Sequence, residues 1–155
     1  MDDLVLEVKS LTSWYRDTDE HGRRHDHTVL HDVSFTLRRG EILGLVGESG
    51  SGKTVTAMTL SGLIERKKAT LSGEVRFDGR DILRLPRAEL RAIQGRELGV
   101  VFQEPMTAMD PLMRIGPQVE EALAVHTQLT KEQRRARALE ALHDVDLPAP
   151  EEIYR

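Results

Sequence analysis

Length, composition and charge exclude several classes of protein. At 155 residues, with 39% hydrophobic and 31% charged residues, the chain is long enough for one folded domain and lacks the composition of a disordered protein. Its formal net charge of -4, without a gathered face of Lys and Arg, argues against a nucleic-acid partner, and the absence of cysteine excludes disulfides and thiolate metal sites.

The first part of the chain predicts a β layer. The acidic N-terminus lacks the features of a secretory signal, and no apolar run approaches the roughly 18 residues of a membrane span. Apolar and polar residues alternate over 4–8 and again over 33–37, which predicts two half-buried strands. The charged segment 16–27 between them predicts a solvated loop. A later strand pattern over 75–77 runs into Asp78-Gly79, a strong hairpin signal.

Two continuous apolar runs, 42–46 and 98–102, predict strands that are buried on both faces of a sheet. The first run leads into a glycine-rich segment and then into a helical pattern, so strand, loop and helix follow in order. Apolar spacing, Pro86 and a capping box of Thr130 with Gln133 together predict helices over 53–64, over 86–93, over 119–126 and from Thr130 onward.

The glycine-rich segment carries the strongest motif. Gly47-Glu48-Ser49-Gly50-Ser51-Gly52-Lys53-Thr54 matches the phosphate-loop pattern at every fixed position. Its place after a buried strand and before a helix is the one that phosphate binding requires, because the loop amides and the helix N-terminus then face the same anion. A flexible Gly/Ser turn with an incidental lysine is the alternative interpretation.

Two residues of this motif have specific expected roles. Lys53 is a cation at a helix N-terminus, which is unfavourable unless an anion is bound there, so we expect it to reach the β- and γ-phosphates. Thr54 offers a hydroxyl suited to Mg²⁺, which would bridge the same phosphates. Thr56, one residue beyond Val55 in the predicted helix, completes the expected nucleotide-binding set.

With these motifs the chain resembles the ATP-binding cassette (ABC) ATPases, and among them the ATP-binding subunits of oligopeptide, dipeptide and nickel importers. Residues 44–54 are similar to the phosphate loop of that subfamily, and residues 101–107 are similar to its Q-loop segment. Asp110-Pro111 and residues 113–116, which follow, are also similar to the sequence found in the peptide importers. The resemblance implies that Gln103 contacts Mg²⁺ and the attacking water, and that Tyr15 stacks on adenine. Without it, Gln103 is a polar strand end and Tyr15 an aromatic at the rim of a β core.

Other family motifs needed for hydrolysis are not visible. The signature LSGGQ, the Walker B strand with its carboxylates and the switch histidine are all missing, and the lookalikes at 60–63, 71–74 and 100–104 lack the required residues or position. Glu104 is therefore not expected to be the catalytic base. We expect that the sequence stops before the signature helix, as a truncated or frame-shifted copy or an incomplete sequence, and that the isolated chain is marginally stable.

The expected fold is α/β: a P-loop core with an N-terminal antiparallel β subdomain, ending before the signature helix and the Walker B strand. One nucleotide-binding domain over 1–155 would comprise the β subdomain and P-loop core at 1–102 and the Q-loop with the start of the helical subdomain at 103–155.

The function implied by the resemblance is that of the ATP-binding, energy-coupling subunit of an ABC importer for peptides or related solutes. It implies Mg²⁺ and ATP, transmembrane permease subunits and a second ATP-binding subunit as partners, no direct contact with the solute, and a place at the cytoplasmic face of the cell membrane. The alternatives are a non-catalytic or vestigial nucleotide-binding fragment, an unrelated P-loop NTPase such as a GTPase or small kinase, and a cassette that serves export or a soluble role.

Weaker signals favour structural interpretations. A histidine cluster at 21, 25, 27 and 31 suits a metal by residue type, but a solvated loop is the preferred interpretation. Arg134, Arg135 and Arg137 with nearby glutamates predict a solvent-facing helix rather than a membrane-binding one. His126 is expected to fill an apolar face.

Overall fold

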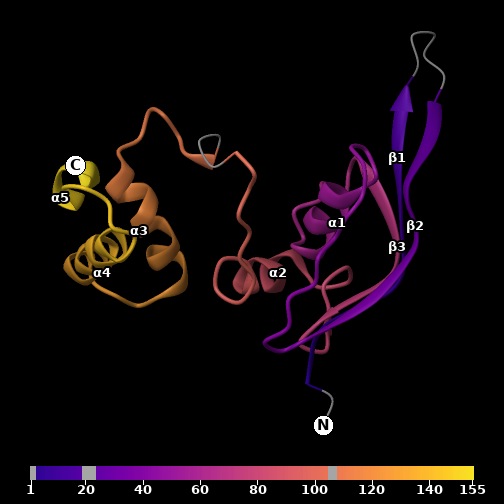
Figure 1. Cartoon of the computed structure of the whole chain (residues 1–155), viewed down its shortest axis with the longest axis horizontal. Coiled ribbons are helices and arrows are strands. Elements are labelled where there is room, and N and C mark those ends of the chain that lie inside the picture. Colours follow the sequence, from indigo (N-terminus) through magenta and orange to yellow (C-terminus); the bar gives the residue numbers. More distant parts are fainter. Residues whose placement is uncertain (1–2, 19–23, 105–107) are drawn as a thin grey trace. The chain divides into compact units, whose positions relative to one another are not determined.

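The computed structural model describes residues 3–18, 24–104 and 108–155, which form two compact units, Met1–Arg91 and Ala92–Arg155. The first unit holds the β-sheet and one helix on one of its faces, and the second is helical (Figure 1). The predicted domain division at 102/103 stays a prediction.

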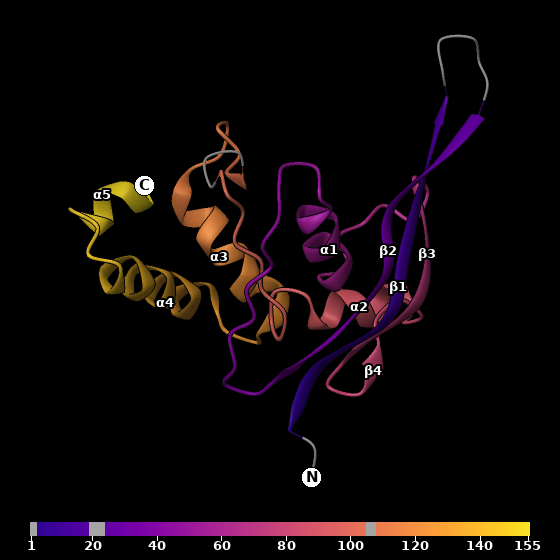
Figure 2. The same cartoon turned by 45° about the vertical axis from the view of Figure 1, so that its right-hand side comes forward.

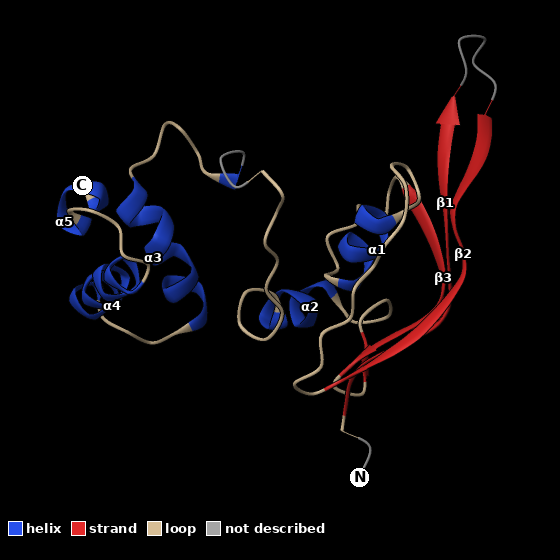
Figure 3. Cartoon of the chain, viewed as in Figure 1, coloured by secondary structure: helices blue, strands red, loops and turns tan. Residues whose placement is uncertain are grey.

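A four-stranded antiparallel sheet forms the first unit, in the order β2-β1-β3-β4 (Figure 3). Its strands are β1 (Leu4–Thr18), β2 (Arg24–Arg38), β3 (Ala69–Phe77) and β4 (Arg80–Asp81). The two strands predicted at 4–8 and 33–37 are confirmed and pair with each other, Leu6 opposite Leu37 and Val8 opposite Phe35.

The arms of the first hairpin are longer than predicted. The segment 16–27 was expected to be a loop, but β1 continues to Thr18 and β2 starts at Arg24, with Tyr15 opposite His27. Strand pairing is made by backbone groups, so a charged and unpatterned sequence can extend a ladder that its apolar part has already aligned.

The hairpin predicted at Asp78-Gly79 joins β3 to β4. Both turn residues have positive φ, 43° and 77°, as a two-residue turn of this kind requires, and Phe77 pairs with Arg80 across it. The strong local turn chemistry explains why the sequence located this hairpin correctly.

Helix α1 (Lys53–Leu60) lies beside the sheet in both Figure 1 and Figure 2. It ends four residues earlier than predicted, because Gly62 takes a φ of 68° and Leu63 N–H bonds to Met58 O at 2.8 Å, a helix-terminating arrangement. The core of this unit includes Leu11 and Val75, both with 0% of their surface exposed.

The two apolar runs are the main error of the sequence-based prediction. Residues 42–46 and 98–102 form no strand in the structure, and Ile42, Val46 and Val101 are 96–97% exposed. A doubly buried strand requires neighbouring strands and helices on both faces of its sheet, and the described residues supply neither to these runs.

The second unit contains α3 (Ile115–His126), α4 (Lys131–Asp144) and α5 (Pro150–Tyr154), while α2 (Arg87–Ile93) spans the boundary between the units. The predicted capping box is present: Gln133 N–H donates to Thr130 Oγ1, and Thr130 N–H donates to the Gln133 side chain. Helix α5 was not predicted, because five residues are too few to show a helical period.

Candidate phosphate-binding site

Gly52 fixes the junction between the glycine-rich loop and α1. It is the N-cap residue, with φ 88° and ψ 5°, and a Cβ atom there would lie 2.8 Å from Leu30 Cδ2 and 3.3 Å from Val29 O. Only glycine combines this left-handed conformation with so close an approach to β2. The start of α1 is thereby held against the sheet.

Lys53 folds back over the loop. Its ammonium group donates to Gly47 O at 2.8 Å, to Glu48 O at 2.7 Å and to Ser51 Oγ at 3.3 Å. The loop therefore curls around a cation, at a helix end that has neither a side-chain cap nor an acidic residue in its first turn. The first N–H groups of a helix have no partner within it, so this end favours an anion.

The three threonines of α1 differ in what their hydroxyls do. Thr56 is buried and donates to Gly52 O at 2.9 Å, and Thr59 donates to Val55 O at 2.7 Å. Thr54 is exposed, and its hydroxyl meets no partner in the part of the chain that the structure describes. An available hydroxyl beside the loop is a donor type that suits Mg²⁺.

The remaining loop residues, Glu48 to Ser51, are exposed to solvent. Ser51 N–H bonds to Glu48 O at 3.2 Å, which closes a tight turn, and Gly50 has a φ of 80°. A Cβ at Gly47 would lie 2.6 Å from Ser51 Oγ, so a larger residue there would have to displace the Ser51 side chain.

Tyr15 lies on β1, which pairs with β2, the strand whose Leu30 approaches Gly52. It is half-buried, and burial raises the pKa of its phenol above the usual value. In the register it stands opposite Ala69 on β3 and His27 on β2, two positions along β1 from Ser13, which pairs with Leu30. The register thus places Tyr15 two positions along β1 from the residue that pairs with Leu30; its contact with adenine stays a prediction.

Gln103 belongs to the second unit, where it is exposed and follows the extended run 98–102. Residues 105–107 of the expected Q-loop lie outside the described residues. The structure describes each unit by itself, so the predicted metal contact of Gln103 stays a prediction.

The histidine cluster, the arginines of α4 and His126, which the sequence singled out more weakly, have different surroundings in the structure. No group of three His, Asp or Glu suited to a metal is found among residues 3–18, 24–104 and 108–155, and His21 lies outside that range. Arg137 pairs with Glu140 on an exposed face, as predicted, but Arg134 is half-buried and donates to Leu129 O at 2.8 Å. His126 is half-buried against Gly95.

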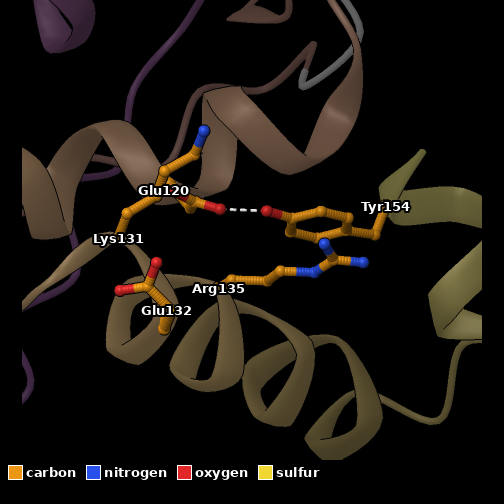
Figure 4. A pocket seen from close by; sticks show the side chains of 5 residues that line it. All are labelled: Glu120, Lys131, Glu132, Arg135 and Tyr154. Atoms are coloured by element: carbon orange, nitrogen blue, oxygen red, sulfur yellow. Dashed lines mark hydrogen bonds between the residues drawn. The ribbon is translucent and has the colours of Figure 1, made fainter.

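A pocket of about 300 Å³ lies in the helical unit, lined by Glu120, Lys131, Glu132, Arg135 and Tyr154 (Figure 4). The Tyr154 hydroxyl donates to Glu120, and the Arg135 guanidinium lies 5.1 Å from the centre of the tyrosine ring. These side chains hold α5 on α3 and α4. None of them belongs to the glycine-rich loop.

Comparison with protein-family models gives a match to the ABC transporter family over residues 30–153. The dipeptide transport ATP-binding protein DppD of Lactococcus lactis is 41% identical over 151 residues, which are 97% of this chain and 42% of that protein. The oligopeptide transport ATP-binding protein OppD of Salmonella typhimurium is 39% identical, covering 94% of this chain and 42% of the relative. The chain thus spans less than half the length of these relatives.

A solved structure agrees with this match. The ATP-binding cassette MJ0796, in a dimeric post-hydrolysis state bound to ADP and Pi, superposes with a TM-score of 0.76 at 29% identity, over 93% of this chain and 58% of that one. The expected α/β fold with its N-terminal antiparallel sheet is thereby confirmed. On its sequence and its fold, the chain belongs to the ABC transporter family and carries part of an ATP-binding cassette.

Proposed function

We propose that this chain binds ATP with Mg²⁺ through residues 47–54. The observation that carries the proposal is the loop that curls around the Lys53 ammonium at an uncapped helix N-terminus. In this arrangement the Lys53 ammonium exchanges its loop carbonyls for β- and γ-phosphate oxygens, and the loop amides complete the anion site. When bound, Mg²⁺ would neutralise phosphate charge, and the exposed Thr54 hydroxyl is the group that we propose to hold it. Gln103 is the proposed second metal contact.

We propose further that the ATP site powers the import of peptides or related solutes. The supporting observation is that two relatives are named as dipeptide and oligopeptide transport ATP-binding proteins. Permease subunits would then provide the membrane path. None of the helices in residues 3–18, 24–104 and 108–155 has the length and apolar character of a membrane span. A second ATP-binding subunit would face the loop, as in the dimeric cassette. The site would then lie at the cytoplasmic face of the membrane.

Replacing Lys53 tests ATP binding. We expect Lys53→Ala to weaken Mg-ATP binding by about 10- to 100-fold, the size expected for losing charge-assisted hydrogen bonds to phosphate, as measured by calorimetric titration. Lys67→Ala is the matched control, because Lys67 is an exposed lysine of the same unit outside the loop. Equal ATP affinity of wild type and Lys53→Ala would contradict the site.

Two further measurements on the same protein separate the alternatives. Measurable ATP binding without turnover of Mg-ATP is expected, since the sequence contains neither the signature motif nor a Walker B strand. GTP is expected to compete poorly for the site, and a preference for GTP would favour an unrelated P-loop NTPase.

A further inference from the structure

The β1–β2 hairpin contains two consecutive β-bulges, one on each strand. Residues 9–10 of β1 stand opposite Ser34 alone, and residues 31–32 of β2 stand opposite Thr12 alone. A bulge interrupts the backbone ladder and leaves the extra residue without its ladder partner. The N–H group of that residue then needs another acceptor, which is either water or a side chain.

A hydroxyl group serves as that acceptor in both bulges. The bulged residues with positive φ are Ser10, at 47°, and Asp32, at 48°. Ser10 N–H donates to Ser34 Oγ at 2.8 Å, and Asp32 N–H donates to Thr12 Oγ1 at 3.1 Å. In each case the acceptor belongs to the single residue opposite the bulge, so a side chain replaces the ladder bond. The two hydroxyls thus join the strands where the backbone pairing is interrupted.

The bulge on β2 adjoins the residues that support the start of α1. A Cβ atom at Gly52 would lie 3.3 Å from Val29 O and 2.8 Å from Leu30 Cδ2. A further register shift follows directly at Val29, so the whole stretch 29–32 of β2 is irregular. Because β2 lies at the edge of the sheet, β1 is its one neighbouring strand in the described part of the chain. The placement of this stretch therefore depends on the bonds that reach it from β1.

We propose that Thr12 is a positioning residue for the phosphate loop. Its hydroxyl holds the N–H group of Asp32, which fixes the stretch 29–32 and keeps it against Gly52. This inference rests on the proposed ATP site, because a loop whose support is displaced binds nucleotide only from the fraction of molecules in which it is correctly placed. Ser34 holds the other bulge, further along β2 from the contact with Gly52, and supports the hairpin without placing the loop.

The test compares variants that differ in one hydroxyl. Thr12→Val keeps the shape of the side chain and loses the acceptor, whereas Thr12→Ser keeps the acceptor. We expect Thr12→Val to weaken Mg-ATP binding by at least about threefold, the size expected for the loss of one hydrogen bond. Without nucleotide it should also speed hydrogen exchange of the Thr56 amide, which bonds to Gly52 O at 2.8 Å. Thr12→Ser and the matched control Ser34→Ala should stay within about twofold of the wild type in both measurements.

The outcomes separate this inference from the proposed ATP site. If the wild type does not bind Mg-ATP, the ATP site is wrong, and the exchange of Thr56 still decides the role of Thr12. Unchanged exchange and affinity in Thr12→Val would overturn that role, as would a Thr12→Ser variant that behaves like Thr12→Val. The role is also wrong if Ser34→Ala has the same effect as Thr12→Val. It is equally wrong if the amide of Val75, buried on β3, exchanges faster by the same factor as that of Thr56, because the hydroxyl then supports the whole sheet.

Discussion

At the scale of single residues, Gly52 in the glycine-rich loop and Gly79 in the β3–β4 turn are required for different reasons. Gly52 combines a positive φ with close contacts to β2, whereas Gly79 has a similar φ of 77° and nothing within 4 Å of its would-be Cβ. The phosphate-loop motif identified Gly52 and the hairpin signal identified Gly79, but only the structure shows that Gly52 also makes a close contact that Gly79 lacks.

This difference predicts the effects of two matched substitutions. Gly79→Ala carries the cost of a left-handed alanine, about 1–2 kcal/mol. We expect Gly52→Ala to cost more, about 2–4 kcal/mol, because its Cβ also displaces Leu30 from the core, as measured by urea unfolding. Equal free energies of unfolding for the two variants would show that the contact with β2 contributes nothing.

At the scale of elements, local signals succeeded and long-range requirements failed. The hairpin turn at 78–79 and the capping box at Thr130 depend on neighbouring residues, and both were predicted correctly. The runs 42–46 and 98–102 have the composition of buried strands, but a strand also needs partners, which composition cannot supply. Helix α5 is short and is held by contacts distant in sequence, so no periodicity reveals it.

The docking of α5 gives a pH-dependent prediction. The hydrogen bond to Glu120, and then burial, raise the pKa of Tyr154 above the ordinary value of 10.0. A folded-state pKa above the unfolded one adds stability at lower pH, and this stability is lost as pH rises through the folded pKa. We expect Tyr154→Phe to lower the melting temperature near neutral pH, and the difference from wild type to shrink at about pH 11.

Hydrogen exchange locates this effect within the helical unit. In Tyr154→Phe the amides of α5 should exchange faster, while those of β1 and β3 in the other unit should not change. A variant whose melting temperature differs from that of the wild type by the same amount at both pH values would mean that the Tyr154–Glu120 hydrogen bond does not support α5.

At the scale of the whole molecule, the chain divides into a sheet unit with the phosphate loop and a helical unit with the expected Q-loop residue. The sequence identified the loop because every one of its residues is adjacent in the chain. It could not identify the close approach of Gly52 to Leu30, because residues 30 and 52 are brought together only by the fold. The exposed apolar runs 42–46 and 98–102 agree with the predicted marginal stability of the isolated chain, which stays a prediction.

The central claim is that the chain binds ATP at residues 47–54, and amide chemical shifts recorded during a titration with Mg-ATP test it most directly. The account predicts that the largest shift changes fall on Gly47 to Thr54, with smaller ones around Tyr15. No shift changes at the loop, or changes confined to the pocket of Glu120, Arg135 and Tyr154, would contradict it.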